Sequence, residues 1–555
     1  MFLTYKSPVY EYIKSPDQTS VTRAHHPLVV VGAGPVGMAA AIDAGIQGLK
    51  ALVLDDNNTV SVGSRAVCWS KRALEILDRL GCAERMVAKG VTWKVGKTFY
   101  RDKLIRQFDL LPASGYKQPA FINLQQYYLE EYLVERLNQL DNVMVRWKNK
   151  VIGVAETEDS VLLTIDTPDG VYNISCDWLV VADGANSTVR SLVGLESKGQ
   201  VFEDRFLIAD ILMKADFPPE RWFSFDPSYH RGWSTLLHRQ PDNLWRLDFQ
   251  LGADADPEEE KKPENVIPRV KAMMGDDVEF ELEWASIYNF SCRQMDKFRH
   301  GRLLFVGDAA HQVSPFGARG ANSGFQDTDN LIWKLKLVME NKAPKRLLDS
   351  YDAERVPAAR ENLLNSTRTT DFMSPKSGIS KIFRNAVLEL ASDFEFARNL
   401  SNSGRLSDPA ILSDSSLNTA DEDSFAGELV PGNVVADAPV KGRNGESWLL
   451  SVLNSSFHLL YFIDSATELG QKDIEALQRI TGESIPVQLI IISDKIKQIP
   501  GLFVLEDSEG MVKERFDGEP GTTYLVRPDQ HVAARWRVFD FQKVVAALKR
   551  ATCYE

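Results

Sequence analysis

The chain has 555 residues, of which 44% are hydrophobic and 25% are charged, a composition that predicts a globular protein of about two to four domains. Its formal net charge of −13 excludes attraction to nucleic acids or to an anionic membrane as its main function. The five cysteines are scattered without a CxxC pair, so we expect a reducing, cytoplasmic environment and no metal site. No apolar run has the length of a membrane span.

A dinucleotide-binding unit is predicted near the N-terminus. Residues 28–31 (LVVV) are typical of a buried strand, and residues 32–37 (GAGPVG) follow as a GxGxxG turn. A helix is predicted after this turn, and a second buried strand over 51–54 ends at Asp55. Glycines let the backbone approach a pyrophosphate, a helix N-terminus attracts its charge, and an acid accepts hydrogen bonds from a ribose. The alternative is a glycine-rich turn in an ordinary α/β core.

Two polar side chains near this unit are further candidates. Arg65 lies in the polar loop after the second strand, where it is either a phosphate contact or a solvated surface charge. Gln126 lies at the start of a helix that apolar residues at four-residue spacing predict over 125–138. Its side-chain amide fits a ligand contact and a surface position equally well.

The chain is predicted to return twice to the sheet of the first unit. A buried strand over 178–182 ends at the Asp-Gly pair 183–184, and another ends at the Gly-Asp pair 307–308. The second pair is followed by a loop of small residues and by a long helix that begins near Asn322. Small side chains let the backbone of such a loop lie against a ligand, and the helix N-terminus stabilises negative charge.

The segment between these two returns, 196–290, is predicted to be a different domain. Apolar and polar residues alternate in it and aromatic side chains are frequent, which is typical of an antiparallel sheet with one covered face. Alternation in residues 244–251 (LWRLDFQL) places three apolar side chains on one side of a strand and Arg246 on the other. The aromatic side is expected to be core and, beside a nucleotide domain, also a wall for a flat aromatic ligand.

These segments define the domain organisation. The expected parts are a flexible arm (1–26), a discontinuous nucleotide-binding domain (27–195 with 291–400), the antiparallel-sheet domain (196–290), a Ser/Asp-rich linker (401–430) and a small α/β unit (431–555). Within the first domain, strands over 143–145, 151–154 and 161–165 are expected to form a small antiparallel layer.

The three motifs, taken in this order, resemble those of the single-component FAD-dependent aromatic hydroxylases, such as para-hydroxybenzoate hydroxylase, phenol hydroxylase and 3-(3-hydroxyphenyl)propionate hydroxylase. The resemblance covers about residues 27–370. It implies an α/β fold with a Rossmann-like FAD-binding domain and an antiparallel-sheet substrate domain. Residues 431–555 resemble the thioredoxin-like domain of the phenol hydroxylase branch. Because they lack a CxxC pair, that resemblance implies a structural role, for example at a dimer interface, and we expect a homodimer.

The resemblance also implies roles for individual residues. The residues it places on FAD are Gly32, Gly34, Pro35, Val36, Gly37, Asp55, Asp56, Arg65, Gln126, Asp183, Gly184, Asp308, Gly320, Ala321 and Asn322. For the reaction it implies Pro315, whose carbonyl lies near the reacting oxygen, and Arg246, which meets the flavin as it moves. The family often has Gly-Gln-Gly where this chain has residues 317–320 (GARG).

The reaction implied by the resemblance uses NADH or NADPH, O2 and a small phenolic substrate. Reduced FAD adds oxygen to give a flavin hydroperoxide, whose distal oxygen hydroxylates the ring. His238 and Tyr288 are candidates for the base that ionises the phenol, although a packed or solvated side chain is the simpler explanation of each. A carboxylated substrate would require an arginine, and the candidates are Arg231, Arg239, Arg246 and Arg293.

Two other classes of function stay open at this point. The same fold supports epoxidation, halogenation or reduction by an FAD enzyme. The alternative that is not an enzyme is a protein that binds flavin without catalysing a reaction.

Overall fold

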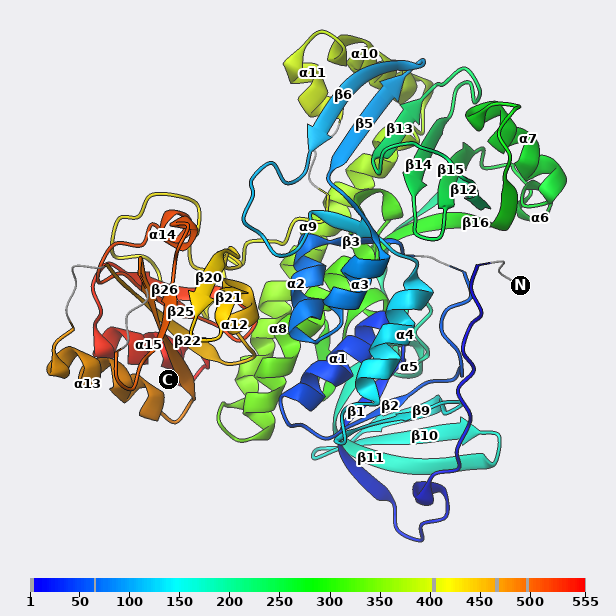
Figure 1. Ribbon diagram of the computed structural model, residues 1–555. Coiled ribbons are helices and arrows are strands. Elements are labelled where there is room, and N and C mark those ends of the chain that lie inside the picture. The colour runs from blue at the N-terminus through cyan, green and yellow to red at the C-terminus, as the bar shows by residue number, and fades with distance from the viewer. Residues whose placement is uncertain (1–3, 64–65, 402–405, 465–468, 496–498, 555) are drawn as a thin grey trace.

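The computed structural model describes residues 4–63, 66–401, 406–464, 469–495 and 499–554. The chain folds around three large sheets (Figure 1). One sheet and its helices form the lower centre of the view, a second sheet lies above it in green and blue, and the C-terminal unit lies to the left in orange and red. None of the helices in the described ranges is both long enough and apolar enough to cross a bilayer.

The first sheet is the predicted nucleotide-binding sheet, with hydrogen-bonded order β17-β18-β11-β1-β2-β8 and with β10 and β9 extending from β11. Its strands are β1 (Ala24–Val31), β2 (Ala51–Leu54), β8 (Val143–Arg146), β9 (Lys150–Glu156), β10 (Val161–Thr167), β11 (Gly170–Val181), β17 (Arg299–His300) and β18 (Leu303–Phe305). Strands β18, β11, β1, β2 and β8 are parallel to one another along this path, whereas β17 pairs antiparallel with β18. The expectation that 143–145 belongs to the antiparallel layer is therefore wrong, because β8 pairs in parallel with β2 after a crossover helix.

Several helices pack beside this sheet. They are α1 (Pro35–Ile46), α2 (Lys71–Arg79), α3 (Ala83–Lys89), α4 (Gln126–Leu137), α5 (Thr188–Leu192) and α8 (Gly320–Met339). A separate small sheet of β3 (Cys68–Ser70), β7 (Phe121–Asn123) and β4 (Val91–Trp93) links this domain to the second sheet. Helix α2 begins at Lys71, because residues 68–70 pair with β7.

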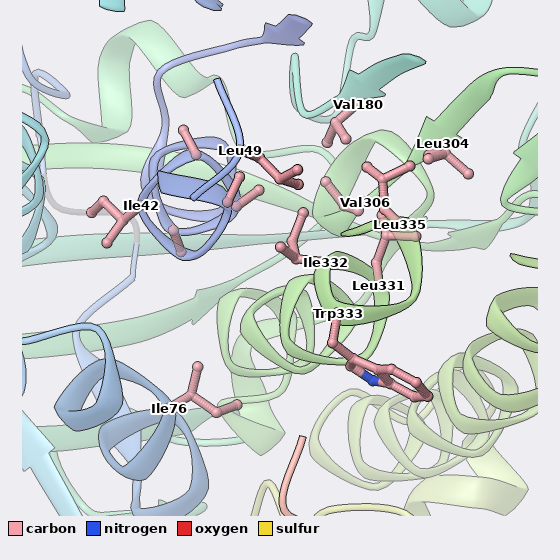
Figure 2. Close-up of a cluster of buried hydrophobic side chains, with 14 of the residues drawn as sticks. Ile42, Leu49, Ile76, Val180, Leu304, Val306, Leu331, Ile332, Trp333 and Leu335 are labelled. Carbon is pink, nitrogen blue, oxygen red and sulfur yellow. The ribbon is translucent and has the colours of Figure 1, made fainter. Parts of the chain in front are cut away.

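Helix α8 is buried on two faces. Leu331 and Leu335 point toward Val180 and Leu304 of the first sheet, whereas Trp333 points away from them (Figure 2). The Trp333 ring packs edge-on against Phe457 of the C-terminal unit, with centroids 5.6 Å apart. A helix that is apolar on opposite sides must be covered by two bodies, and here it joins them into one core.

The N-terminal arm is packed against the first domain, contrary to the expectation of a flexible segment. Tyr5 is buried, stacks on Tyr127 with centroids 4.0 Å apart, and donates a hydrogen bond of 3.0 Å to Glu131. Tyr10 stacks on Trp147 with centroids 4.6 Å apart. Aromatic burial of this kind outweighs the entropy of the arm, so the arm is part of the folded domain.

The second sheet has the order β19-β16-β12-β15-β14-β13-β5-β6. Its strands are β5 (Val95–Tyr100), β6 (Lys103–Asp109), β12 (Lys198–Leu212), β13 (Arg221–Phe225), β14 (Ser234–Arg239), β15 (Leu244–Leu251), β16 (Glu281–Gln294) and β19 (His311–Gln312). The predicted domain 196–290 supplies the middle of this sheet. Strands β5 and β6 come from a segment that was predicted to belong to the nucleotide-binding domain, and β5 joins the sheet by pairing in parallel with β13.

Helices α6 (Pro257–Glu260) and α7 (Pro263–Met274) lie at the green outer side of the second sheet (Figure 1). Three further helices follow α8: α9 (Asp349–Met373), α10 (Gly378–Ala391) and α11 (Glu395–Ser401). Helix α9 runs from the first domain to the second sheet, where Ser234 donates to the carbonyl of Met373 at 3.0 Å. Short 3₁₀ turns are η1 (Pro16–Gln18), η2 (Gly307–Ala309), η3 (Pro315–Gly317), η4 (Lys345–Leu348) and η5 (Ile480–Gly482).

The C-terminal unit is a seven-stranded mixed sheet with order β21-β20-β24-β23-β22-β25-β26. Its strands are β20 (Pro439–Gly442), β21 (Gly445–Trp448), β22 (Phe457–Ile463), β23 (Val487–Ser493), β24 (Phe503–Glu506), β25 (Thr523–Val526) and β26 (Val532–Trp536). Its helices are α12 (Leu449–Val452), α13 (Gln471–Arg479), α14 (Met511–Phe516) and α15 (Phe541–Ala551). The described part of the predicted linker is packed: Leu417 is fully buried, and Thr419 donates to the carbonyl of Ala533 at 2.8 Å.

A fully buried ion network joins the C-terminal unit to the first domain. Glu354 of α9 accepts hydrogen bonds from Arg527 at 2.5 and 2.9 Å and from Lys334 at 2.6 Å. Arg527 also pairs with Asp529 at 2.5 Å. Two carboxylates and two cations balance each other, and the Arg527 and Lys334 charges hold the pKa of Glu354 far below its usual range despite burial. Removing one member would leave a buried charge without its partner.

We predict that Glu354→Ala lowers the free energy of unfolding by about 3–5 kcal/mol, because Lys334 and Arg527 lose their shared carboxylate at a fully buried site. The measurement is urea unfolding followed by tryptophan fluorescence. The control is Glu422→Ala, whose partner Lys543 lies at the surface, and which should cost less than about 1 kcal/mol. Equal losses of unfolding free energy in the two variants would contradict the stabilising role of the buried ion network.

Candidate active site

Two cavities meet at the carboxyl edge of the first sheet. The first has a volume of about 470 Å³ and lies over the ends of β1, β2 and β11. The second has a volume of about 680 Å³ and lies between the N-terminus of α8 and the second sheet. Their walls share Gly34, Ser61, Glu130, Ala182 and Gly184. Together they form one elongated site that reaches from the nucleotide-binding sheet to the second sheet.

The turn after β1 has the geometry that a bound pyrophosphate requires. Gly32 has φ +104°, and a Cβ there would lie 2.4 Å from the carbonyl oxygen of Ala182. A Cβ on Gly37 would lie 2.0 Å from the carbonyl oxygen of Gly32, so Gly37 brings α1 close to the turn and lines neither of these two cavities. A Cβ on Gly34 would meet no protein atom within 4 Å, because this glycine faces the open cavity at the start of α1.

The ribose end of the first cavity contains Asp55 and Asp56. The Asp55 carboxylate accepts hydrogen bonds from the backbone N–H of Ala33 at 2.5 Å and of Asn57 at 2.8 Å. Burial raises the pKa of Asp55, and these two donors offset only part of that rise. Further hydroxyl donors, such as those of a ribose, would stabilise the charged form. Arg65 lies outside the described residues.

A buried acid that sequence analysis missed lies between the two cavities. Glu130 accepts hydrogen bonds from Ser61 at 2.5 and 2.6 Å and from the side-chain amide of Gln126 at 2.7 Å. Burial raises the pKa of Glu130 although these donors lower it. Gln126 lines the second cavity, as the ligand hypothesis requires. Glu130 follows Gln126 by one helical turn, so the spacing of α4 could have identified it.

The Asp-Gly motif lies at the junction of the cavities. One carboxylate oxygen of Asp183 accepts a hydrogen bond of 2.9 Å from the backbone of Val189, while its Oδ1 atom is buried without a partner within the described residues. Burial raises the pKa of Asp183 more than its donors lower it. Gly184 has φ +80° and space beyond its Cα. An unpaired acceptor beside an open backbone fits a ligand that carries hydroxyl groups.

The Gly-Asp motif and the loop after it line the second cavity. Asp308 and Pro315 belong to this wall, and the Pro315 carbonyl accepts a hydrogen bond of 2.9 Å from Ala318. The N-terminal residues of α8 that line it are Gly320, Ala321 and Asn322. The Asn322 side chain is hydrogen-bonded to the backbone of β3: it donates to the carbonyl of Cys68 at 2.9 Å and accepts from the N–H of Ser70 at 3.1 Å. Backbone N–H groups of the first turn therefore carry the attraction for negative charge.

The second sheet presents a polar face to the cavity. Asp210, Arg246, His238 and Arg221 are directly opposite one another on β12, β15, β14 and β13, so they form one row across the sheet. Arg246 is held by Asp210 through two hydrogen bonds of 2.8 and 2.7 Å. The predicted alternation in β15 is thus confirmed, and Arg246, His238 and Tyr288 all line the cavity.

The aromatic wall is only partly where it was expected. The apolar face of β15 packs against α7 on the far side of the sheet, in a cluster that contains Trp245, Leu247 and Phe249. Aromatic rings of the cavity wall come instead from other positions: Phe206, Tyr288, Phe290 and Phe316. Of the four arginines considered for a carboxylate, only Arg246 lines the cavity, and Arg221 was missed.

A thiol, an imidazole and a guanidinium meet on this wall. Cys68 Sγ lies 3.9 Å from His238 Nδ1 and 3.9 Å from an Nη atom of Arg221, and His238 Nε2 lies 3.6 Å from Asp248. Burial raises the pKa of Cys68, but Arg221 and His238 outweigh it and the pKa is lowered. Burial lowers the pKa of His238, but Asp248 and Cys68 outweigh it and the pKa is raised.

The residues that line the two cavities therefore fit FAD chemically. The glycine cradle at the start of α1 matches a pyrophosphate, and the unpaired or incompletely paired acids of the first cavity match ribose hydroxyls. In the second cavity, the N-terminus of a twenty-residue helix matches an anionic ring edge. The fold and site define a dinucleotide-dependent oxidoreductase with a separate chamber for a second ligand.

Comparison with known proteins gives the same class. Residues 25–366 match the family described as FAD binding domain. A 6-methylpretetramide 4-monooxygenase of Streptomyces rimosus is 30% identical over 532 residues, covering 92% of this chain and 90% of that protein. A 3-(3-hydroxy-phenyl)propionate/3-hydroxycinnamic acid hydroxylase of Mycolicibacterium smegmatis is 25% identical over 512 residues, covering 91% and 90%. The crystal structure of the flavin-dependent monooxygenase PieE with FAD and substrate has a TM-score of 0.79 at 21% identity, covering 96% and 99%.

The chain belongs to the FAD binding domain family and, within it, to the single-component FAD-dependent aromatic hydroxylases. It is a flavoprotein monooxygenase that uses FAD as its cofactor and NADH or NADPH as its co-substrate.

We predict that Gly34→Ala weakens FAD binding at least tenfold while changing the stability of the apoprotein by no more than about 1 kcal/mol. The new methyl group would meet no protein atom within 4 Å and would project into the cavity where the pyrophosphate is expected. The measurement is the dissociation constant of FAD by flavin fluorescence, with thermal unfolding of the apoprotein beside it. Gly482→Ala is the control, since it also adds a methyl group in open space but lies in the C-terminal unit. Unchanged FAD affinity in Gly34→Ala would place the pyrophosphate elsewhere.

Proposed function

We propose that this enzyme hydroxylates a small phenolic compound in the second cavity. The observation that carries the proposal is the continuity of the FAD cradle with a chamber that combines aromatic rings and a buried polar row. Bound FAD supplies the electrons of NAD(P)H and activates O2. The residues of this chain bind the ring, orient it and exclude water from it.

The predicted FAD contacts keep their implied roles in this proposal. Gly32, Gly34 and Gly37 form the pyrophosphate turn with Pro35 and Val36, and Asp55 with Asp56 holds the ribose. Asp183, Gly184, Gln126 and Asp308 follow the ribityl chain, as their positions along the two cavities support. Gly320 and Ala321 offer backbone N–H groups at the flavin ring, and Asn322 fixes them to β3 through its side chain. Arg65 retains the phosphate role implied by resemblance.

The ring hydroxyl loses its proton to the pair formed by His238 and Asp248. His238 Nε2 and Asp248 Oδ1 are both buried without a hydrogen-bond partner among the described residues, and both residues line the chamber. A raised pKa makes neutral His238 a stronger base toward a phenol. Tyr288 lines the same wall and is the alternative proton acceptor. Arg246, fixed by Asp210, contributes a positive charge that stabilises the phenolate.

The C-terminal unit is, we infer, a thioredoxin-like domain without redox function. Parallel β22, β23 and β24 flanked by antiparallel β25 and β26, with α13 and α15 beside them, support that comparison. Its single cysteine, Cys553, is a free thiol. The buried network around Glu354 supports a structural role for this unit. Five free thiols in the chain support a cytoplasmic location.

We further infer a homodimer, formed through the outer face of α10 and α11 rather than through the C-terminal unit. Side chains at helical spacing on α10 are 42–82% exposed although they are large and apolar: Ile379, Ile382, Phe383 and Leu390. Phe394, Phe396 and Leu400 continue the patch. At about 150–200 Å² per side chain, the exposed parts amount to roughly 700 Å², close to the roughly 800 Å² that a standard interface buries per partner.

The function is tested by aerobic oxidation of NADH and NADPH by the purified yellow protein with simple phenols, phenolic acids and dihydroxybenzenes. We expect at least one ring compound to accelerate oxidation and to give a stoichiometric hydroxylated product, because a ring that fills the chamber excludes water and suppresses loss of oxygen as peroxide. Product and hydrogen peroxide are both quantified. Peroxide alone with every compound would contradict hydroxylation of a simple phenol.

The dimer is tested by sedimentation velocity of the holoenzyme. We predict that Phe383→Glu raises the dissociation constant of the dimer at least tenfold, because it places a charge in the apolar face. Val538→Glu, at a 73% exposed apolar position of the C-terminal unit, should leave the dimer intact. The reverse pattern would move the interface to the C-terminal unit.

A further inference from the structure

The N-terminal arm connects the two domains on the outside of the molecule. Its described part begins at the second sheet, where the backbone N–H and the hydroxyl of Thr4 donate to the Glu283 carboxylate of β16 at 3.0 and 2.7 Å. From there the arm runs along one side of the first domain, in dark blue (Figure 1). It precedes β1, and the match to the FAD binding domain family begins only at residue 25, so the family gives the arm no role.

The arm pairs with a loop of the first cavity. This loop, residues 56–62, follows β2 and is called the ribose loop here; all of its residues except Asn58 line the cavity. Tyr10 donates its N–H to the carbonyl of Asn58 at 2.8 Å and accepts from the Asn58 side-chain amide at 3.1 Å. Val9 and Thr59 form an antiparallel β-bridge. None of the described arm residues lines either cavity, so the arm supports the loop from behind.

A small apolar cluster fixes the same loop. Its buried members are Tyr5 of the arm, Val60 of the ribose loop and Tyr127 of α4. The Tyr5 ring stacks on Tyr127 with centroids 4.0 Å apart, and its hydroxyl donates to Glu131 at 3.0 Å. Val60 is only 4% exposed although it belongs to a loop at a cavity. Loss of the Tyr5 ring would expose Val60 and remove one side of the support of the loop.

The ribose loop has few other supports. Ser61 donates to Glu130 of α4 from its backbone N–H at 2.5 Å and from its hydroxyl at 2.6 Å. Apart from the bridge to Val9, residues 56–62 form no helix or strand, and the structure describes all of them. A segment with few packed contacts opens at a low cost in free energy, so contacts from a second segment determine how often it opens.

We propose that the N-terminal arm is a positioning segment of the cofactor site: it holds the ribose loop against the ribose end of FAD, and it must release this loop before FAD can leave. The proposal rests on the placement of FAD in the first cavity and is independent of the aromatic substrate. FAD in that cavity adjoins the loop, and the loop adjoins the arm. FAD binding and docking of the arm therefore stabilise each other.

The first test compares two tyrosines of the arm in the full-length holoenzyme. Tyr5→Ser should raise the dissociation rate of FAD at least tenfold, because it exposes Val60 and frees the ribose loop. Tyr12→Ser is the control on the same arm and should change this rate less than twofold, since its hydroxyl donates to Gln18 and Thr167 and not to the loop. Release is followed by flavin fluorescence after dilution. Equal dissociation rates in the two variants would overturn the proposal.

The second test locks the arm to the loop and does not remove any packing at Tyr5. Val9→Cys combined with Thr59→Cys places two thiols on antiparallel partners, whose Cβ atoms lie close enough for a disulfide. The oxidised protein should release FAD at least tenfold more slowly than the same protein after reduction with dithiothreitol. Thr59→Cys alone should release FAD at one rate under both conditions. Equal rates in the oxidised and reduced forms of the double variant would overturn the proposal.

The variant Gly34→Ala separates this proposal from the placement of FAD. If Gly34→Ala leaves FAD affinity unchanged, the placement in the first cavity fails and the role of the arm fails with it. If Gly34→Ala weakens FAD binding while Tyr5→Ser and the cross-link leave the dissociation rate of FAD unchanged, the placement stands and the role of the arm is refuted. Hydroxylation of a phenol is measured separately and decides neither.

Discussion

The register of three parallel strands determines the position of everything in the active site. Val31, Val181 and Phe305 lie side by side at the ends of β1, β11 and β18. Hydrogen bonds continue beyond the strands, from Ala182 to the carbonyl of Val31 at 2.8 Å and from Val306 to that of Val181 at 3.0 Å. Because parallel strands end at one edge of a sheet, three motifs far apart in the chain open into the same pair of cavities.

The two faces of the second sheet differ, since one is apolar and buried and the other carries charged side chains. Alternate residues put an apolar cluster against α7 and a polar row toward the chamber. Most charges in that row are compensated within the protein, Arg246 by Asp210 and His238 by Asp248. Arg221 lies 3.9 Å from the Cys68 thiol and over the ring of Phe223. The sheet is therefore a scaffold for stability on one side and for recognition on the other.

Helix α8 couples these regions to the C-terminal unit. Its N-terminus lines the chamber, its middle packs on the first sheet, and Trp333 and Lys334 face the C-terminal unit and its buried charges. The unit that carries Arg527 is therefore fixed to the helix that presents backbone donors to the cofactor site. The C-terminal unit lacks cysteine pairs, so it contributes to the oxidoreductase by holding α8 and α9 in place.

Local patterns in the sequence determined much of this protein. Apolar runs, glycine turns and alternation each act within one element, so β1, β2, α1, α4 and the two faces of β15 are where the sequence predicts them. The motif residues at 32–37, 183–184 and 307–308 followed from the same reasoning, since backbone conformation near a ligand restricts residue type locally.

Only the tertiary structure decided which residues meet across elements. The pairing of β5 with β13, the parallel position of β8 and the docking of the N-terminal arm depend on contacts between distant segments. The cluster of Cys68, His238 and Arg221 joins three strands, and no spacing along the chain indicates it. Whether a buried arginine has a charged partner depends on its neighbours in space, because electrostatic compensation is set by distance and burial rather than by order in the sequence.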